Sequence, residues 1–148
     1  MAIGAALFTA LTLMLGLAGA ASASALPVVH GNNDGGWAHG MIKPGNIYLG
    51  GLYGNAYVGP LAGSSAGTLK WSHWTGTSAY GRGLLEVNLC RPDCAAGHYA
   101  RYAASVTLRR PEVHRGVRYF SRLTLRYFHG YQRSYTYKWK SQMWVGGP

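Results

Sequence analysis

The residues best suited to binding chemistry are cations and aromatic rings that alternate near the end of the chain. In residues 117–128, every second side chain belongs to one set: Arg118, Phe120, Arg122, Thr124, Arg126 and Phe128. Lys138 and Lys140 repeat the two-residue spacing one segment later. Interleaved cations and flat rings are typical of surfaces that bind single-stranded nucleic acid. We therefore predict a polyanion-binding face made of Arg118, Phe120, Arg122, Arg126, Phe128, Lys138 and Lys140.

This face is expected to point outward. A strand cannot bury arginines at every second inward position without partners, and the chain has only 4 acidic residues against 14 Lys and Arg. The alternative is a solvated face whose charges merely discourage edge-to-edge aggregation. Phe120 and Phe128 count against full solvation, because such rings are either covered by another sheet or form a contact surface.

The two cysteines, Cys90 and Cys94, flank a turn with Pro92 at its bend. Three intervening residues around a proline can bring the Cα atoms within disulfide range, and we predict a disulfide that pins this turn. The alternative is a zinc site made of Cys90, Cys94 and His98. Zinc takes four ligands, and no second Cys/His pair completes the set, so no metal is predicted.

Catalytic residues are not evident in the rest of the sequence. The 6 histidines have no paired spacing. The acids beyond the first segment are Asp34, Glu86, Asp93 and Glu112, and a carboxylate-based hydrolase needs two that oppose each other. The chain has neither a Gly-x-Ser-x-Gly elbow nor a phosphate-binding glycine loop. We predict no catalytic residue and no cofactor.

Alternation of apolar and polar side chains predicts the strands that must hold the basic face. It is clearest in residues 102–108, 117–128 and 131–145, and shorter strands are expected at 46–49, 68–74 and 84–90. No stretch has the period of a ten-residue amphipathic helix. The pattern therefore predicts an all-β fold, a small antiparallel β-sandwich or barrel.

Glycine, proline and tryptophan set the details of this expected sheet. Gly76, Gly81 and Gly83 are expected to interrupt it, and Pro111 to end a strand, because proline cannot donate to a β-ladder. Trp71 is expected in the core. Trp74, an odd number of residues away, is predicted to be either a second core ring across a bulge or an exposed stacking surface.

The N-terminal residues have the order of a signal peptide. Residues 3–17 form an apolar run too short to span a membrane comfortably, followed by Ala21-Ser22-Ala23-Ser24-Ala25. This predicts a signal peptide over 1–25, with cleavage after Ala25 or alternatively after Ala23; a retained membrane anchor is the other interpretation. No later run approaches a membrane span. We expect a secreted, extracellular protein with a flexible lead-in at 26–42 and a single β domain at 43–148.

The net charge of +10 is unevenly distributed. From Arg101 onward the only acid is Glu112, against eight arginines and two lysines. An anionic partner is therefore expected to meet the protein in this C-terminal third.

The order of several motifs resembles a group of small exported proteins of streptomycetes and related actinobacteria. The motifs are Trp71-Ser72-His73-Trp74, Ala79-x-Gly81-x-Gly83, Asn88-x-Cys90-x-Pro92-x-Cys94-Ala95-x-Gly97, Val106-Thr107-Leu108-x-x-Pro111 and Tyr119-Phe120-x-x-Leu123-Thr124-Leu125. The resemblance covers residues 43–127, and the chain departs from the group in its arginine-rich strand and its Tyr/Trp/Lys tail. It implies export and a compact β-domain, with no activity attached.

These observations predict a non-enzymatic secreted β-domain that contacts an anionic extracellular or cell-envelope partner. Teichoic acid, extracellular nucleic acid and an anionic envelope surface are the partners expected outside such a cell. Two alternatives are a small secreted enzyme or toxin whose site is assembled only in the fold, and a secreted inhibitor that presents the Cys90–Cys94 turn.

Overall fold

The computed structural model describes residues 25–31, 39–50, 56–59, 68–96 and 98–146. The regular elements in these ranges are strands: β1 (Ile47–Tyr48), β2 (Ala56–Val58), β3 (Lys70–Trp74), β4 (Ala79–Asn88), β5 (Tyr99–His114), β6 (Val117–Tyr127), β7 (Tyr131–Lys138) and β8 (Met143–Gly146). The predicted all-β fold is confirmed. The predicted signal peptide lies outside the described residues, apart from Ala25. No helix in the described ranges is long and apolar enough to cross a membrane.

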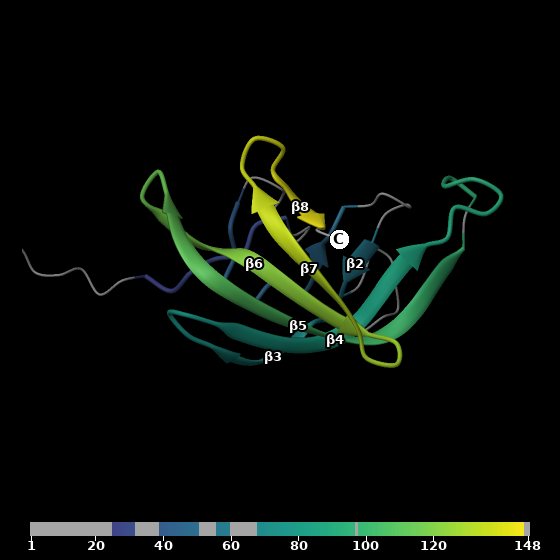
Figure 1. Cartoon of the computed structure of the whole chain (residues 1–148), viewed down its shortest axis with the longest axis horizontal. Helices are drawn as coiled ribbons and strands as arrows, with labels where there is room; N and C mark the ends of the chain where they lie inside the picture. Colours follow the sequence, from purple (N-terminus) through teal and green to yellow (C-terminus); the bar gives the residue numbers. More distant parts are fainter. Residues whose placement is uncertain (1–24, 32–38, 51–55, 60–67, 97, 147–148) are drawn as a thin grey trace, which may run out of the picture.

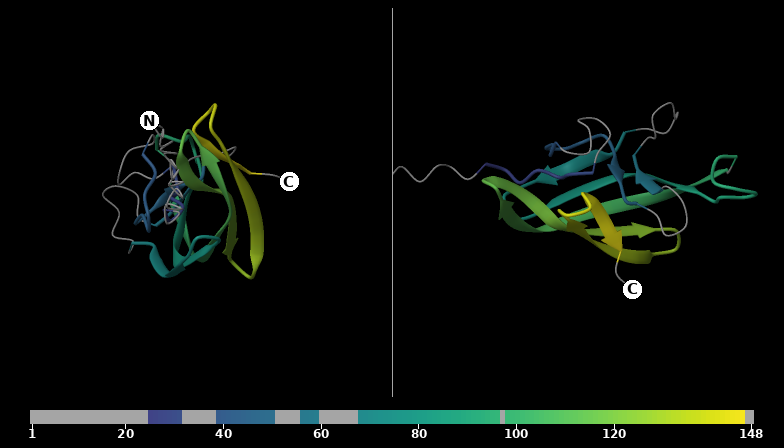
Figure 2. Two further views of the ribbon diagram at one scale, coloured as in Figure 1. Left: turned by 90° about the vertical axis from the view of Figure 1, so that its left-hand side faces the viewer. Right: turned by 90° about the horizontal axis from the view of Figure 1, so that it is seen from above.

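The strands form one 8-stranded sheet in the order β1-β2-β4-β5-β6-β7-β8, with β3 paired to β4. Each strand pairs antiparallel with its neighbours. The sheet curls until it is nearly closed, with the strands at the two ends of the order, β1 and β8, approaching each other (Figures 1 and 2). The result is barrel-like, with an inner face toward the core and an outer face toward solvent.

Alternating apolar side chains of the long central strands fill the inner face. Val106 and Leu108 of β5 are fully buried and lie opposite Leu125 and Leu123 of β6. Because strand side chains alternate between the two faces, the residues between these apolar ones point outward. The alternating apolar and polar residues that predicted these strands therefore correspond to side chains that face the core and the solvent in turn.

The prediction that Gly81 and Gly83 interrupt the sheet is wrong, because β4 runs through both. A Cβ atom on Gly81 would lie 2.9 Å from Cε3 of Trp71, and one on Gly83 would lie 3.3 Å from a side-chain carbon of Leu69. The missing side chains thus give β3 and its neighbouring residues room to pack against β4. The glycines serve this close approach rather than a turn.

The prediction that Pro111 ends a strand is also wrong, since β5 continues to His114. The pairing of β4 with β5 begins at Ala79, opposite Leu108. Beyond Leu108, β5 pairs with β6 alone, and an edge position tolerates a residue that has no N–H to donate. Likewise, residues 131–145 are two strands, β7 and β8, rather than one.

The described part of the predicted lead-in is built into the domain and is not a flexible extension. Val29 is fully buried, and Val28 forms a parallel bridge to Tyr119 of β6. The backbone oxygen of Pro27 accepts a hydrogen bond of 2.9 Å from Nε1 of Trp74. This segment therefore contributes to the core beside the start of β6.

Trp74 is the second core ring that one of the two predicted alternatives describes. A register shift between Trp71 and His73 in β3 breaks the alternation, as a bulge does. The two indoles consequently meet edge to face, with ring centroids 4.7 Å apart. Trp74 is 9% exposed, which excludes the alternative of an exposed stacking surface.

A cluster of rings around His30 closes one end of the inner face. His30 is 4% exposed, stacks on Tyr137 at 5.3 Å and meets Trp139 edge-on at 4.7 Å. Neither nitrogen of His30 has a hydrogen-bond partner among the described residues. Burial, and then the charges of His114 and His39, lower the pKa of His30 below its ordinary value of 6.5. This histidine is therefore neutral in the folded protein at pH 7.

Acid should destabilise the domain through His30. The unfolded chain protonates this histidine near its ordinary pKa, whereas the folded protein does so only at lower pH, so the free energy of unfolding should fall as the pH drops below about 6.5. Urea unfolding at about pH 7 and about pH 5 measures the loss. His30→Phe keeps the ring and removes the titration, so its stability should change less between the two pH values.

Glu112 does not interfere with this measurement. Hydrogen bonds from Ser121 and Tyr119 lower the pKa of Glu112 from its ordinary value of 4.5. The stability that the ionised carboxylate of Glu112 contributes is therefore lost only as the pH falls below that value. Equal stability of the wild type at the two pH values, or an unchanged loss in His30→Phe, would contradict the role of His30.

Candidate anion-binding surface

The outer face of the sheet gathers cations from four strands. In one row across the sheet, Lys70 of β3 lies beside Arg82 of β4, then Ser105 of β5 and Arg126 of β6. Four residues before Arg126 in β6, Arg122 lies directly opposite Arg109 of β5. We define the basic face as Lys70, Arg82, Arg101, Arg109, Arg122 and Arg126, all of which are exposed.

Short polar side chains occupy the middle of the basic face. Between the row of Arg82 and the pair Arg109–Arg122 lies a row made of Tyr80, Thr107, Thr124 and Ser134. Thr107, Thr124 and Ser134 are shorter than arginine, so the guanidinium groups on either side extend beyond them. The arrangement is a broad, positively charged surface with hydroxyl groups at its centre.

The one carboxylate within the basic face is buried and already paired. Glu86 is 1% exposed, and Nε of Arg101 donates to its Oε1 at 2.7 Å. The other described acids lie elsewhere: Glu112 accepts hydrogen bonds from Tyr119 and Ser121, and Asp93 accepts from two backbone N–H groups of its own loop. Among the described residues, no exposed acid opposes the basic face.

Two further arginines are held in place through Nε, as Arg101 is. Arg82 donates from Nε to the hydroxyl of Tyr80 at 2.9 Å, and Arg126 donates from Nε to Oε1 of Gln132 at 2.8 Å. The hydrogen bond from Arg82 is the main reason that the pKa of Tyr80 is lowered. Since a guanidinium has five N–H donors, each arginine keeps its four terminal donors for a ligand.

A shallow groove joins this surface to exposed aromatic rings. Its lining includes Tyr80, Arg82, Arg101, Arg126 and Phe128. Phe128 is 50% exposed and begins the turn between β6 and β7. It stacks on Tyr131, the first residue of β7, with the two rings inclined by only 6°. Flat rings thus lie beside three guanidinium groups.

The structure divides the predicted residues into several groups. Arg122 and Arg126 lie on the basic face, and Lys138 lies at the end of β7, two residues beyond Thr136 on the same side. Phe128 borders the face at the turn. Lys140 follows β7 in the turn to β8 and is not part of the face.

Phe120 and Arg118 do not belong to the surface on which they were predicted. Phe120 is fully buried; its ring meets Trp74 edge-on at 5.6 Å, and its backbone N–H donates to the oxygen of Val28. Arg118 is half-buried near Gly76. The prediction for Phe120 is wrong because Trp74 and the segment at Val28 cover this part of β6.

The sequence interpretation missed Arg82, Arg101 and Arg109, which come from β4 and β5. A signal was present, because Tyr80 and Arg82 alternate with Ala79, Gly81 and Gly83. Glycines are more often found at breaks than inside strands, and this hides the alternation. The neighbour relations between arginines of different strands depend on the register of the sheet and have no local signal.

The two cysteines and the acids considered for an enzyme already have partners within the described ranges. Cys90 and Cys94 form a disulfide with sulfur atoms 2.04 Å apart, so these thiols are not metal ligands. No group of three His, Cys, Asp or Glu side chains that could hold a metal occurs among the described residues. Glu86 and Asp93, the acids considered for an enzyme, make the contacts described above and do not hydrogen-bond to His30.

Fold and surface together define a small, nearly closed antiparallel β-domain with a basic outer face. Comparisons with protein-family models, with curated proteins and with solved structures found no match to this chain.

Proposed function

We propose that this protein is a non-enzymatic secreted domain that binds an anionic polymer of the extracellular space or cell envelope through its basic face. The observation that carries the proposal is the convergence of Arg82, Arg109, Arg122 and Arg126 from three strands on one exposed surface. Among the described residues, the one acid within that surface is buried against Arg101. Polymers with repeated phosphate groups, such as teichoic acid or single-stranded nucleic acid, fit this pattern of charge.

The basic face suits a polymer better than a single small anion. Arg122 and Arg126 are four residues apart along β6, a separation of about 13 Å, and Arg82 lies two strands away from Arg126. One phosphate cannot reach all three guanidinium groups over this span, whereas a chain of phosphates can. Each neutralised phosphate releases condensed counterions, so binding should depend steeply on salt.

Titration with two polymers at several salt concentrations tests the proposal. We expect oligo(dT) and poly(glycerol phosphate) to bind the wild type at low salt, with affinity falling as salt rises. In the triple variant Arg82→Gln/Arg122→Gln/Arg126→Gln, the slope of log K against log salt for oligo(dT) should become shallower by about 2, at about 0.7 per lost phosphate contact. Phe128→Leu should weaken binding of oligo(dT) alone, because only nucleic acid has bases to stack.

A matched variant controls for net charge. Arg91→Gln/Arg115→Gln/Lys140→Gln removes three charges from turns outside the basic face and should leave most of the affinity and the slope intact. Failure of the wild type to bind either polymer at low salt, binding without salt dependence, or equal losses in the two triple variants would each refute the proposal.

A second candidate function, inhibition of a partner protein, is favoured by the stapled turn. The connection between β4 and β5 projects from the sheet (Figure 1), and Arg91–Ala96 within it are exposed. A rigid exposed loop is the usual form of such an inhibitor. The same titration separates the two candidates, since an inhibitor of this kind has no need to bind either polymer.

A further inference from the structure

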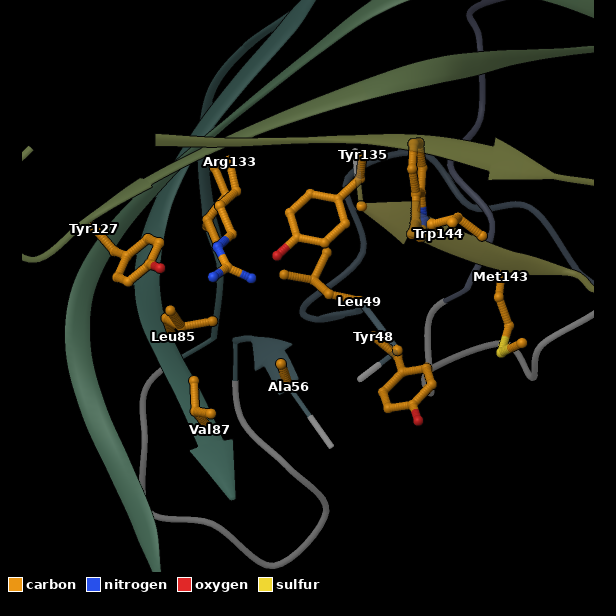
Figure 3. A pocket seen from close by; sticks show the side chains of 14 residues that line it. Tyr48, Leu49, Ala56, Leu85, Val87, Tyr127, Arg133, Tyr135, Met143 and Trp144 are labelled. Carbon is orange, nitrogen blue, oxygen red and sulfur yellow. The ribbon is translucent and has the colours of Figure 1, made fainter. Parts of the chain in front are cut away.

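The incomplete closure of the sheet leaves a cavity on the inner face. Its volume is about 450 Å³, and its walls come from β2 and β4 on one side and from β6, β7 and β8 on the other. Figure 3 shows the side chains that surround it. The volume lies in the range of small-molecule sites and is too small for the polymer proposed for the basic face. We call it the inner cavity.

The walls of the inner cavity are mostly apolar. Leu85 and Trp144, which are 2% exposed each, are among the lining residues, and Leu125 is 1% exposed. Tyr127 and Tyr135 add ring surface. Apolar walls of this kind favour a ligand with an apolar body, because its transfer from water is favourable in proportion to the area buried.

Arg133 is the one cation among the described lining residues, and it projects into this space. Arg133 lies directly opposite Leu125 in the pairing of β7 with β6, a position on the inner face of the sheet. In Figure 3 its guanidinium points into the cavity, in the same direction as the hydroxyl-bearing ring of Tyr135. Arg133 thus differs from the arginines of the basic face, which point to the opposite side of the sheet.

No carboxylate in the described part of the chain neutralises Arg133. The cavity has no acidic residue in its described lining. Glu86 is bound to Arg101 on the outer face, and Glu112 is bound to Tyr119 and Ser121. Burial raises the pKa of Tyr135, so this neighbour is a neutral phenol and supplies no negative charge. Arg133 is exposed, so its guanidinium is hydrated at the mouth of the cavity, and its planar N–H donors are available to an anion that enters there.

We propose that the inner cavity binds a small organic acid, a carboxylate attached to an aromatic or compact aliphatic body. The planar guanidinium of Arg133 pairs with the carboxylate through two parallel hydrogen bonds, and the body of the ligand packs between Leu85, Leu125 and Trp144. One cation matches one negative charge. A phosphate monoester would bring a second charge that this apolar cavity leaves uncompensated.

A pair of matched probes tests this proposal on the whole protein. 2-Naphthoic acid carries the carboxylate, and 2-naphthylmethanol is a neutral molecule of similar shape. We expect the acid to bind about tenfold more tightly or better, because a hydrogen bond to a charged group is stronger than a neutral one. Arg133→Met should remove this advantage and leave the affinity for the alcohol nearly unchanged. Titration calorimetry measures both ligands.

Two further variants show where the probe binds. Arg122→Met removes the same charge from the basic face and should leave binding of the acid unchanged. Val87→Phe places a larger side chain in the opposite wall of the cavity and should weaken both ligands at least tenfold. Equal affinity for acid and alcohol, unchanged binding of the acid by Arg133→Met, or equal losses in Arg122→Met and Arg133→Met would overturn the proposal. Tighter binding of 2-naphthyl phosphate than of the acid would overturn the choice of carboxylate.

Discussion

Replacing Phe120 with alanine is expected to lower the free energy of unfolding by about 3–5 kcal/mol. Phe120 is fully buried and packs edge-on against Trp74. Removal of its ring would leave a cavity between β6, β3 and the N-terminal segment around Val28, whose backbone oxygen accepts a hydrogen bond from Phe120. Since small domains are stable by only about 5–15 kcal/mol, the variant should be close to unfolding. Urea unfolding followed by tryptophan fluorescence measures the change.

Phe128 provides the matched comparison. It differs from Phe120 only in position, because it is 50% exposed in the turn after β6. Phe128→Ala should therefore cost about 1 kcal/mol or less, mainly through its contacts with Tyr102 and Tyr131. Similar losses of stability in the two variants would mean that Phe120 is not in the core.

Arg101→Met is expected to destabilise the domain by about 1–3 kcal/mol, although Arg101 lies at the surface. Its side chain is 49% exposed, but the carboxylate of its partner Glu86 is 1% exposed. The substitution would leave a buried negative charge without the guanidinium that compensates its loss of hydration. Methionine preserves most of the apolar contact of the arginine stem, so the measured loss reports on the charge.

Two variants test this explanation. Arg109→Met removes a surface arginine that has no acidic partner among the described residues and should change stability by less than about 0.5 kcal/mol. Adding Glu86→Gln to Arg101→Met removes the buried charge and should restore part of the loss. If the double variant is no more stable than Arg101→Met, the buried charge is not the cause.

Local alternation of side chains carried most of the fold prediction. Val106 and Leu108, or Leu123 and Leu125, recur at every second position, and this period is set by the geometry of a strand and of no other element. The disulfide between Cys90 and Cys94 was also predictable, because it joins residues of one turn. Arg133 could have been predicted to face inward, since it shares its alternation with Tyr135 and Tyr137.

The alternation does not show which residues of one face are buried by distant parts of the chain, and the packing of distant strands decides this. Phe120 and Phe128 belong to one alternating set, yet one is core and the other exposed, because Trp74 and Val28 cover only the first part of β6. Gly81 belongs to a continuous strand because Trp71 of a neighbouring strand fills the space above it. The local sequence around Phe120 or Gly81 does not indicate which distant residues pack against it.

The sequence by itself determined the class of structure: strands, a basic C-terminal third and a stapled turn all follow from residue types and short spacings. Only the tertiary structure decided which charges act together. Register placed Arg82 and Arg109 beside the arginines of β6, and the curling of the sheet turned the side that carries Arg133 into the wall of a cavity. The physical reason is that a strand's period assigns a residue to one of two faces, whereas its neighbours on that face come from other strands.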